Sequence, residues 1–241
     1  MVPPALSTQE VRVIGYHFPP FVNQSGTGFT HALIKTLNDS QDEYHFSFHL
    51  TSPARRYQDL SSGRGDVIFF EMPEWGWTEK DIQIEPTREI LTGGEVYVAL
   101  NKPGRNQSYF DDITSKRIAA FLSYHYGFAG FDPDRRGLEK NFDIYLTTKH
   151  TTNIRIMLAG RVDVTVVTEA FLHKYLTENP ELKSRIMVSD KRDQTYSLKA
   201  FTRKGSPVTV EWLERFLNKI KKSGRLQALA TEHDIEKILT Y

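Results

Sequence analysis

The strongest constraint on the fold is an alternation of strand-like and helix-like segments that runs along the chain. An alternating apolar segment at residues 11–16 precedes a helical stripe at 29–38, a second alternating segment at 44–50 and a helix that opens at Pro53. A short apolar run at residues 66–70 then has the length and composition of a buried strand. Because parallel strands need crossover connections, this order predicts an α/β fold with mainly parallel sheets flanked by helices.

The second half of the chain repeats part of the first. Residues 62–74 read SGRGDVIFFEMPE, and residues 159–171 read AGRVDVTVVTEAF. In each phrase the Gly can end a helix, and the Arg and Asp are polar residues placed ahead of an apolar strand. We therefore interpret four polar residues of the two phrases as scaffold: Arg64, Asp66, Arg161 and Asp163. The functional signal is expected after each strand, because ligands bind beyond the carboxyl ends of parallel strands.

The composition excludes several function classes. The 241 residues are 25% charged and 39% hydrophobic, with a formal net charge of +1. This is ordinary globular composition, and the near-neutral charge and absence of nucleic-acid-reading motifs argue against a nucleic-acid partner. The absence of Cys removes disulfides and thiolate chemistry, and without an HExxH motif or a carboxylate-rich cluster we expect neither a metal nor a cofactor. No apolar run is long enough to span a membrane.

Further motifs follow one another in a specific order along nearly the whole chain. They are Tyr16 with Pro19-Pro20-Phe21, Gly28-Phe29, Leu60 with Ser62-Gly63-Arg64-Gly65-Asp66-Val67, Lys116-Arg117-Ile118-Ala119 before Tyr124-His125-Tyr126-Gly127, Leu158 with Ala159-Gly160-Arg161-Val162-Asp163-Val164, Phe201-Thr202-Arg203-Lys204-Gly205 before the Trp212 helix, and Ser223-Gly224-Arg225-Leu226. In this order and spacing the chain resembles the type II periplasmic solute-binding proteins. The resemblance is to extracellular family 3, in a form divergent from the polar amino-acid receptors of ABC transporters.

The resemblance implies two lobes, each a mainly parallel sheet flanked by helices. The expected first lobe comprises residues 1–93 and 198–241, and the second comprises 94–197, with hinge strands near 91–96 and 194–200. It also implies a monomeric, non-enzymatic receptor that captures a small molecule between the lobes and serves an ABC transporter permease or a membrane sensor. The family works outside the cytoplasmic membrane. Since the N-terminus lacks the pattern of a signal peptide, we expect a mature periplasmic protein whose signal has been removed.

The sequence departs from the family at both ends of its α-amino-acid clamp. Amino-acid receptors of this family carry an Arg after the third strand, which binds the ligand carboxylate, whereas this chain has Glu71 there and only Lys80 nearby. They also end the second repeated strand with an Asp that binds the ligand ammonium, whereas this chain has Thr168 with Glu169 beside it. We therefore predict that the ligand is not an ordinary amino acid.

Other residues are available for a polar, anionic or aromatic-stacking ligand. Arg56, with Arg55 as the weaker choice, could bind an anion in forked geometry, with a solvated helix start as the competing interpretation. Backbone amides over 123–126 could hold an anionic group, and aromatic side chains at strand ends could stack on a flat ligand. The predicted ligand-binding residues are Tyr16, His17, Phe21, Arg56, Glu71, Trp75, Trp77, Ser123, Tyr124, His125, Tyr126, Thr168 and Glu169. For the tryptophans, packing within the lobe is the rival interpretation.

Two further functions are compatible with this fold. The first is an enzyme of the cyclic-acid dehydratase type, for which Glu71, Glu169 or His125 could act as the acid or base. The second is a sensory input domain of a longer signalling protein.

Overall fold

The computed structural model describes residues 8–241, and within it the chain forms two compact units. Unit 1 runs to Leu91 and resumes at Ser197–Tyr241, whereas unit 2 is the continuous segment Thr92–Tyr196. The N-terminal residues 1–7, to which the signal-peptide expectation applies, lie outside the described part.

Unit 1 is built around a mixed sheet in which the first strands are parallel. Its strands are β1 (Gln9–Gly15), β2 (Tyr44–Leu50), β3 (Val67–Glu71), β4 (Ile84–Pro86) and the C-terminal part of β9 (Ile186–Arg203). The order is β2-β1-β3-β9, with β4 also paired to β9, and the pairs of β1 with β2 and with β3 are parallel. The parallel βαβ arrangement expected from the sequence is therefore present.

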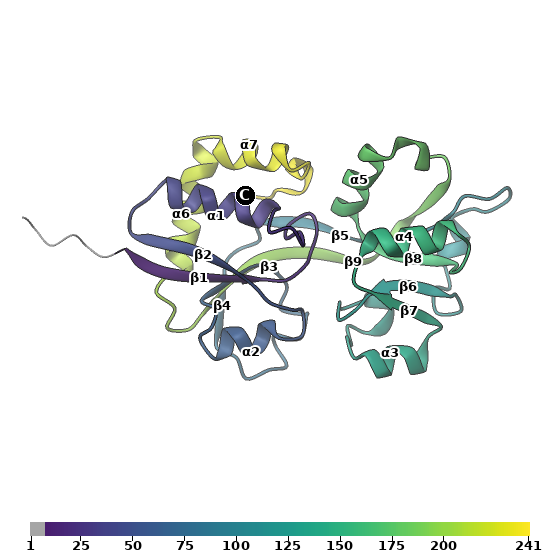
Figure 1. Ribbon diagram of the computed structural model, residues 1–241, viewed down its shortest axis with the longest axis horizontal. Helices are drawn as coiled ribbons and strands as arrows, with labels where there is room; N and C mark the ends of the chain where they lie inside the picture. Colours follow the sequence, from purple (N-terminus) through teal and green to yellow (C-terminus); the bar gives the residue numbers. More distant parts are fainter. Residues whose placement is uncertain (1–7) are drawn as a thin grey trace, which may run out of the picture. The chain divides into compact units, whose positions relative to one another are not determined.

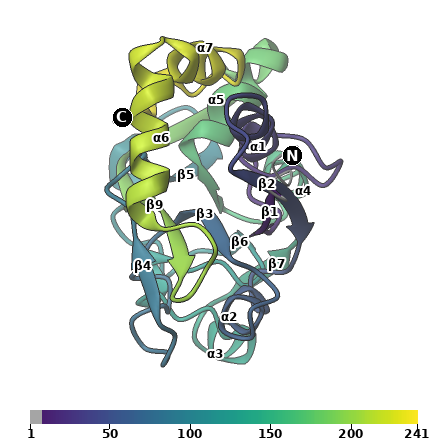
Figure 2. The ribbon, with the colours of Figure 1, turned by 90° about the vertical axis from the view of Figure 1, so that its left-hand side faces the viewer.

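Helices cover both faces of this sheet. The helices are α1 (Phe29–Asp39), α2 (Arg56–Ser61), α6 (Val210–Lys222) and α7 (Arg225–Glu232). Figure 1 shows α1, α6 and α7 on one face and α2 on the other, and Figure 2 shows α6 beside α7. Helix α2 begins three residues after Pro53, because Pro53–Arg55 form a turn instead of the first helical residues.

Unit 2 repeats the parallel pattern on a smaller scale. Its strands are β5 (Leu91–Leu100), β6 (Ile118–Phe121), β7 (Ile144–Thr147), β8 (Val164–Thr168) and the N-terminal part of β9. Its helices are α3 (Arg135–Asn141), α4 (His150–Leu158) and α5 (Glu169–Glu178), of which α4 and α5 lie on one face and α3 on the other (Figure 1). Short 3-10 helices complete the chain: η1 (Gln107–Phe110), η2 (Gly127–Ala129), η3 (Pro180–Leu182) and η4 (Glu236–Ile238).

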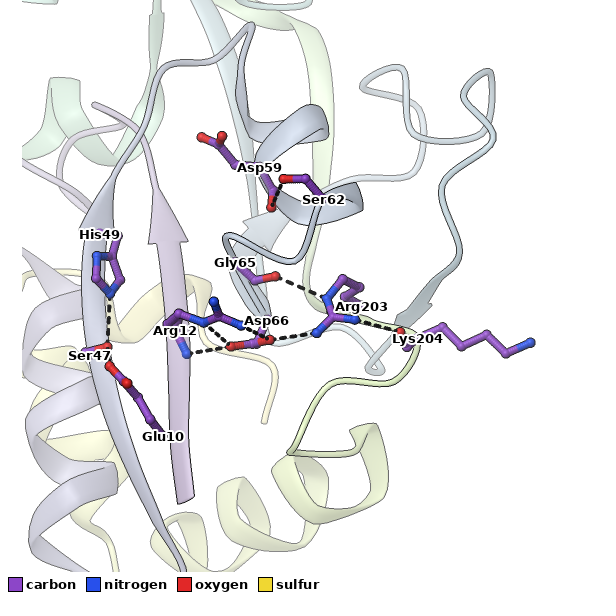
Figure 3. A network of polar contacts seen from close by, with 10 residues as sticks. All are labelled: Glu10, Arg12, Ser47, His49, Asp59, Ser62, Gly65, Asp66, Arg203 and Lys204. Atoms are coloured by element: carbon purple, nitrogen blue, oxygen red, sulfur yellow. Dashed lines mark hydrogen bonds and ion pairs between the residues drawn. The ribbon is translucent and has the colours of Figure 1, made fainter. Parts of the chain in front are cut away.

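The repeated sequence phrase has the same structural role in both units. In unit 1, Asp66 accepts hydrogen bonds from the backbone N–H of Arg12 at 3.0 Å, from its Nε at 2.9 Å and from its Nη2 at 3.1 Å (Figure 3). In unit 2, Asp163 accepts the same three bonds from Arg117, each at 3.0 Å. The Asp of each phrase therefore ties the start of its own strand to the first parallel strand of its unit.

The two carboxylates differ in burial and in their second partner. Asp66 is fully buried and also accepts a bond from Arg203 Nη2 at 2.9 Å, whereas the Asp163 side chain is 32% exposed. Burial alone would raise the pKa of Asp66, but the hydrogen bonds from Arg12 and Arg203 outweigh it and lower that pKa. The contacts of Asp66 and those of Asp163 both agree with the scaffold interpretation of the repeated phrase.

Candidate functional site

In unit 1, a buried cation lies at the carboxyl ends of the parallel strands. Arg56, at the start of α2, has only 1% of its side chain exposed. Its Nε donates to Glu71 Oε2 at 3.1 Å, its Nη2 donates to the carbonyl of Trp75 at 3.2 Å, and its Nη1 donates to the carbonyl of Pro53. All three guanidinium nitrogens therefore have partners within unit 1.

Aromatic rings surround this guanidinium. Its central carbon lies 4.2 Å from the ring centroid of Tyr57, 5.0 Å from that of Tyr16 and 5.7 Å from that of Trp77. Tyr57 also donates its hydroxyl to the carbonyl of Trp75 at 2.5 Å, and burial raises the pKa of Tyr57 to about 12. Cation–π contacts of this kind gain strength when water is excluded, so the cage stabilises a charge that burial alone would disfavour.

Glu71, the last residue of β3, is the counter-charge. Its side chain is fully buried, and Trp77 Nε1 donates to its Oε2 at 2.6 Å. Burial raises the pKa of Glu71 above its ordinary value, whereas Arg56, Trp77 and Tyr16 act to lower it. The predicted residues Tyr16, Arg56, Glu71, Trp75 and Trp77 are thus brought together in one cluster.

An irregularity in β3 directs Glu71 into this cluster. The pairing of β3 with β9 shifts register between Phe69 and Glu71, and Phe70 between them has a φ of 65°. Such a bulge breaks the alternation of side chains across a sheet and re-aims the residue that follows. The five residues of β3 are accordingly all buried, including Glu71.

The remaining aromatic residues of the first loop pack against one another. Phe18 lies 4.9 Å from Phe21, 5.8 Å from Trp75 and 6.0 Å from Tyr16 between ring centroids. The Nδ1 of the half-buried His17 lies 3.2 Å from the carbonyl of Val22. These contacts are those of a packed loop, and the ligand-binding role of Tyr16, His17 and Phe21 stays a prediction.

In unit 2, the loop after β6 is held rigidly by hydrogen bonds and stacking. Ser123 has a φ of 64°, and the Tyr124 ring stacks on Phe121 with centroids 4.2 Å apart. The hydroxyl of the fully buried Tyr126 accepts from the Phe121 N–H at 2.6 Å and donates to the Phe121 carbonyl at 3.2 Å. The carbonyl of the buried His125 accepts from Gln194 Nε2.

A carboxylate of the protein already occupies the amides at the end of this loop. Asp193 accepts from the N–H of Gly127 at 2.7 Å and from the N–H of Phe128 at 2.9 Å, and the Tyr97 hydroxyl also donates to it. Burial raises the pKa of Asp193, against the opposing effect of these three donors. The sequence predicts anion-binding backbone amides at residues 123–126. In the structure, the amides that bind a carboxylate are those of Gly127 and Phe128, and the carboxylate is the protein's own Asp193.

A second buried carboxyl group lies next to Asp193. Glu95, in β5, is fully buried and accepts from Gln194 Nε2 at 2.7 Å. Burial, and then the negative charge of Asp193, raise the pKa of Glu95 well above its ordinary value. In the sheet register Glu95 pairs with Thr168, so this polar group lies beside the carboxyl end of β8.

The raised pKa of Glu95 predicts how stability depends on pH. Between the ordinary carboxyl pKa and the higher pKa of folded Glu95, the native state binds more protons than the unfolded state. The contribution of Glu95 to stability is therefore complete below the ordinary pKa and is lost as the pH rises through the folded pKa. We expect Glu95→Gln to remove this loss, so that its unfolding free energy exceeds that of the wild type increasingly from acidic to neutral pH.

Urea unfolding at several pH values, followed by circular dichroism, measures this difference. Glu169→Gln provides a control, because Glu169 is partly exposed and paired with Arg192 at 2.9 Å. The two variants should differ in how their unfolding free energies change with pH. Equal pH profiles for Glu95→Gln and the wild type would contradict the expectation.

The predicted residues at the end of β8 have local partners. The Thr168 hydroxyl accepts from the Phe171 N–H at 3.3 Å and caps α5, and Glu169 pairs with Arg192. Thr168 is buried, whereas the Glu169 side chain is 30% exposed. Their role toward a ligand stays a prediction.

Sequence reasoning missed several residues of these two clusters: Tyr57, Glu95, Tyr97, Asp193 and Gln194. For Glu95 a signal existed, since it is the only charged residue in the strand sequence LTGGEVYVAL. Asp193 and Gln194 stand in the polar run SDKRDQTYS, where nothing distinguishes a buried acid from its exposed neighbours.

Among residues 8–241, no group of three or more His, Asp or Glu side chains is arranged to hold a metal ion. Within the same residues, no helix has the length and apolar character needed to cross a bilayer.

Solved structures share this fold at low sequence identity. A substrate-binding protein of an ABC uptake transporter from Streptococcus pneumoniae, with bound histidine, is 16% identical with a TM-score of 0.73, covering 96% of this chain and 95% of that one. A histidine kinase sensor domain similar to periplasmic binding proteins is 18% identical with a TM-score of 0.68, covering 96% of this chain and 98% of that one. An ancestral amino-acid-binding protein, described as a precursor of cyclohexadienyl dehydratase, is 18% identical with a TM-score of 0.64, covering 92% and 94%.

These likenesses confirm the predicted fold, the mixed α/β, periplasmic-binding-protein-like fold of type II. No curated protein matches the chain significantly in sequence. The family comparison is nevertheless positive over most of the chain. Residues 12–233 match the bacterial extracellular solute-binding proteins, family 3, and the chain therefore belongs to that family.

Proposed function

We propose that this protein is a periplasmic receptor that captures a small polar solute and closes its two units around it. The observation that carries the proposal is the presence, in each unit, of a buried polar cluster at the carboxyl ends of the parallel strands. The chain passes between the units only within β5 and β9, so two strands provide the hinge for closure. The closed form would be read by an ABC transporter permease or a membrane sensor.

The proposed ligand is polar, with an anionic group or a flat body, and is not a common α-amino acid. At the family's carboxylate-binding position the chain has Glu71, and at its ammonium-binding position it has the buried Thr168. Arg56 is the cation proposed for an anionic group. Because Glu71 already accepts a hydrogen bond from the Arg56 Nε, an anionic ligand would share Arg56 with Glu71 or replace Glu71 as its partner. Aromatic side chains such as Tyr16 and Trp77 would favour a flat body.

Calorimetry and thermal-shift measurements test the ligand class. Binding to the native state alone raises the melting temperature by mass action. We expect flat or cyclic carboxylic acids to raise it and the common α-amino acids to leave it unchanged. Micromolar binding of any common α-amino acid would overturn the ligand assignment while leaving the receptor function intact.

Solution scattering tests closure of the two units. A ligand found in the thermal-shift screen should reduce the radius of gyration. Binding that leaves the radius unchanged would contradict closure.

Thr168→Asp should weaken the binding of an anionic ligand, because it adds a negative charge at a strand end. The control for this variant is Asp190→Ala, which alters an exposed residue of β9 outside both clusters.

A dehydratase activity is the alternative of a different class. The observation in its favour is that Glu71 is a buried carboxyl group with a raised pKa, as a general acid requires. Incubation with cyclic carboxylates, monitored through their ultraviolet absorbance, decides between the two. Turnover that Glu71→Gln abolishes would support the enzyme, and binding without turnover supports the receptor.

A sensory input domain is the third candidate, and the likeness to a kinase sensor domain favours it. The length of the complete gene and its neighbours separate it from a free receptor. Fractionation of cells that express the complete gene tests the periplasmic location.

A further inference from the structure

Unit 1 contains a groove that lies outside the Arg56 cluster. Its volume is about 550 Å³, which is within the range of small-molecule sites. The groove runs between α2 and the strands β1 and β2, and all the residues that line it belong to unit 1. Three of them are arginines, Arg12, Arg55 and Arg64, whereas Asp59 is the only acid among them.

The strand register explains why polar side chains reach this face. Arg12 pairs with Ser47, and Ile14 pairs with His49, so these four side chains share one face of the sheet. The alternate residues Val11 and Val13 are fully buried on the opposite face. Helix α2 packs on β1 and is only six residues long, so the edge strand β2 stays open and Leu50 is 63% exposed.

The arginines of the groove outnumber the carboxylates that neutralise them. Arg64 lies 2.7 Å from Asp59 Oδ1, and Arg55 approaches the same oxygen only to 3.9 Å. Arg12 shares Asp66 with Arg203, and the nearby Glu10 accepts from Ser47 at 2.9 Å (Figure 3). Four arginines therefore share Asp59, Asp66 and Glu10, and a net positive charge remains at the groove.

The other oxygen of Asp59 is also engaged, because the Thr51 hydroxyl donates to Oδ2 at 2.5 Å. Asp59 therefore has short contacts with Arg64 and Thr51, whereas Arg55 stays 3.9 Å away. The Arg55 side chain is 67% exposed, and its guanidinium is available to an anion from outside.

Unit 2 provides an internal comparison. Its equivalent groove, of about 370 Å³, is lined by Arg117, Arg161, Tyr145, Ile156 and Val162. Arg117 corresponds to Arg12, because each makes the same three bonds to the Asp of its repeated phrase. Counting back from that Asp, Asp59 corresponds to Ile156 and Arg55 to Thr152. The charged helix face is thus particular to unit 1 and is not required by the duplicated scaffold.

We propose that the groove of unit 1 binds a small organic anion that carries two negative charges and a short apolar body. Planar guanidinium groups match the oxygens of phosphate or paired carboxylates, and Arg55 and Arg64, which both approach Asp59 Oδ1, supply them. Ile14 and the exposed Leu50 supply the apolar contact, and the volume exceeds what an inorganic ion fills. This site is additional to the solute site proposed above.

The test is an NMR titration with phenyl phosphate at about pH 7.5, where the phosphate carries nearly two charges. Amide shifts locate the site directly. We expect the largest changes at Leu50–Ser52, Arg55 and Arg64, and weaker binding as salt is added. Phenol is the uncharged control and inorganic phosphate is the control without an apolar body. Shift changes confined to the predicted solute-site residues, such as Tyr16, Trp77 and residues 124–128, or equal binding of phenol, would overturn the proposal.

Two matched variants separate a specific role of Arg55 from a general charge effect. Arg55 and Arg135 are both helix-start arginines with an acid four residues later, at 67% and 63% exposure, but Arg135 lines neither groove. We expect Arg55→Gln to weaken phenyl phosphate by about tenfold or more, and Arg55→Lys to restore part of the affinity. Arg135→Gln should change it by less than about twofold. Equal effects of Arg55→Gln and Arg135→Gln, or inorganic phosphate binding as tightly as phenyl phosphate, would contradict the proposed site.

Discussion

Replacing Arg56 by Met should lower the unfolding free energy of unit 1 by about 3–5 kcal/mol, the cost typical of breaking a buried ion pair from one side. The substitution keeps much of the side-chain volume but leaves Glu71 buried without its counter-charge. It also leaves the carbonyls of Pro53 and Trp75 without the guanidinium donors. Urea unfolding followed by tryptophan fluorescence measures the effect in unit 1 alone, since Trp75, Trp77 and Trp212 all belong to that unit.

Two companion variants distinguish the charge from the packing. Arg56→Met/Glu71→Gln has no buried charge at this place and should recover a large part of the loss. Lys35→Met removes a pair of unit 1 whose side chains are 76% and 42% exposed, and should cost less than about 1 kcal/mol. The deficit of Arg56→Met should also shrink as the pH falls and Glu71 takes up a proton. A deficit of the same size in the double variant and at low pH would assign the effect to packing.

The second large effect is expected at Asp193, in unit 2. Asp193→Ala should cost about 3 kcal/mol, because the N–H groups of Gly127 and Phe128 and the Tyr97 hydroxyl lose their acceptor together. The loop packs directly on β9 at this point: a Cβ on Gly127 would lie 2.2 Å from the Asp193 carbonyl oxygen. Water cannot easily replace the carboxylate at such a close contact.

Amide hydrogen exchange at Gly127 and Phe128 is the most direct readout, together with urea unfolding followed by circular dichroism. Exchange should accelerate in Asp193→Ala and less in Asp193→Asn, which keeps an acceptor oxygen. Asp190→Ala is the matched control, as an exposed Asp three residues earlier on the same strand. Unchanged protection of both amides in Asp193→Ala would show that the carboxylate does not hold the loop.

The fold followed from the sequence because its determinants are local patterns. Alternation and helical periodicity predicted the parallel strands of both units, and β2 was expected at residues 44–50, where the structure has it. The repeated Asp was interpreted as scaffold, and it has matching contacts in the two units, Asp66 with Arg12 and Asp163 with Arg117. Family membership, also predicted, depended on the order of many weak motifs and is confirmed.

The partners of the site residues depended on features that a sequence pattern does not carry. A bulge at Phe70 turns Glu71 toward Arg56, and neither residue type nor spacing signals it. Asp193 meets Gly127 across 66 residues of chain, within a run of polar residues that looks uniformly exposed. Such contacts are fixed by tertiary packing. The sequence therefore identified candidate side chains, such as Arg56 and Glu71, but not that they pair with each other.

The division of the chain also has a consequence for biosynthesis. Unit 2 is one uninterrupted segment, and its two ends lie side by side, since a Cβ on Gly94 would be 2.4 Å from the Gln194 carbonyl oxygen. It can therefore complete its fold as soon as residue 196 is available, before the last segment of the chain. Unit 1 starts first but needs the end of β9 as the neighbour of β3, and then α6 and α7. The sheet of unit 1 is therefore completed only after the last fifth of the polypeptide has been made. Until then the edge of β3 is unpaired and can pair with strands of other chains.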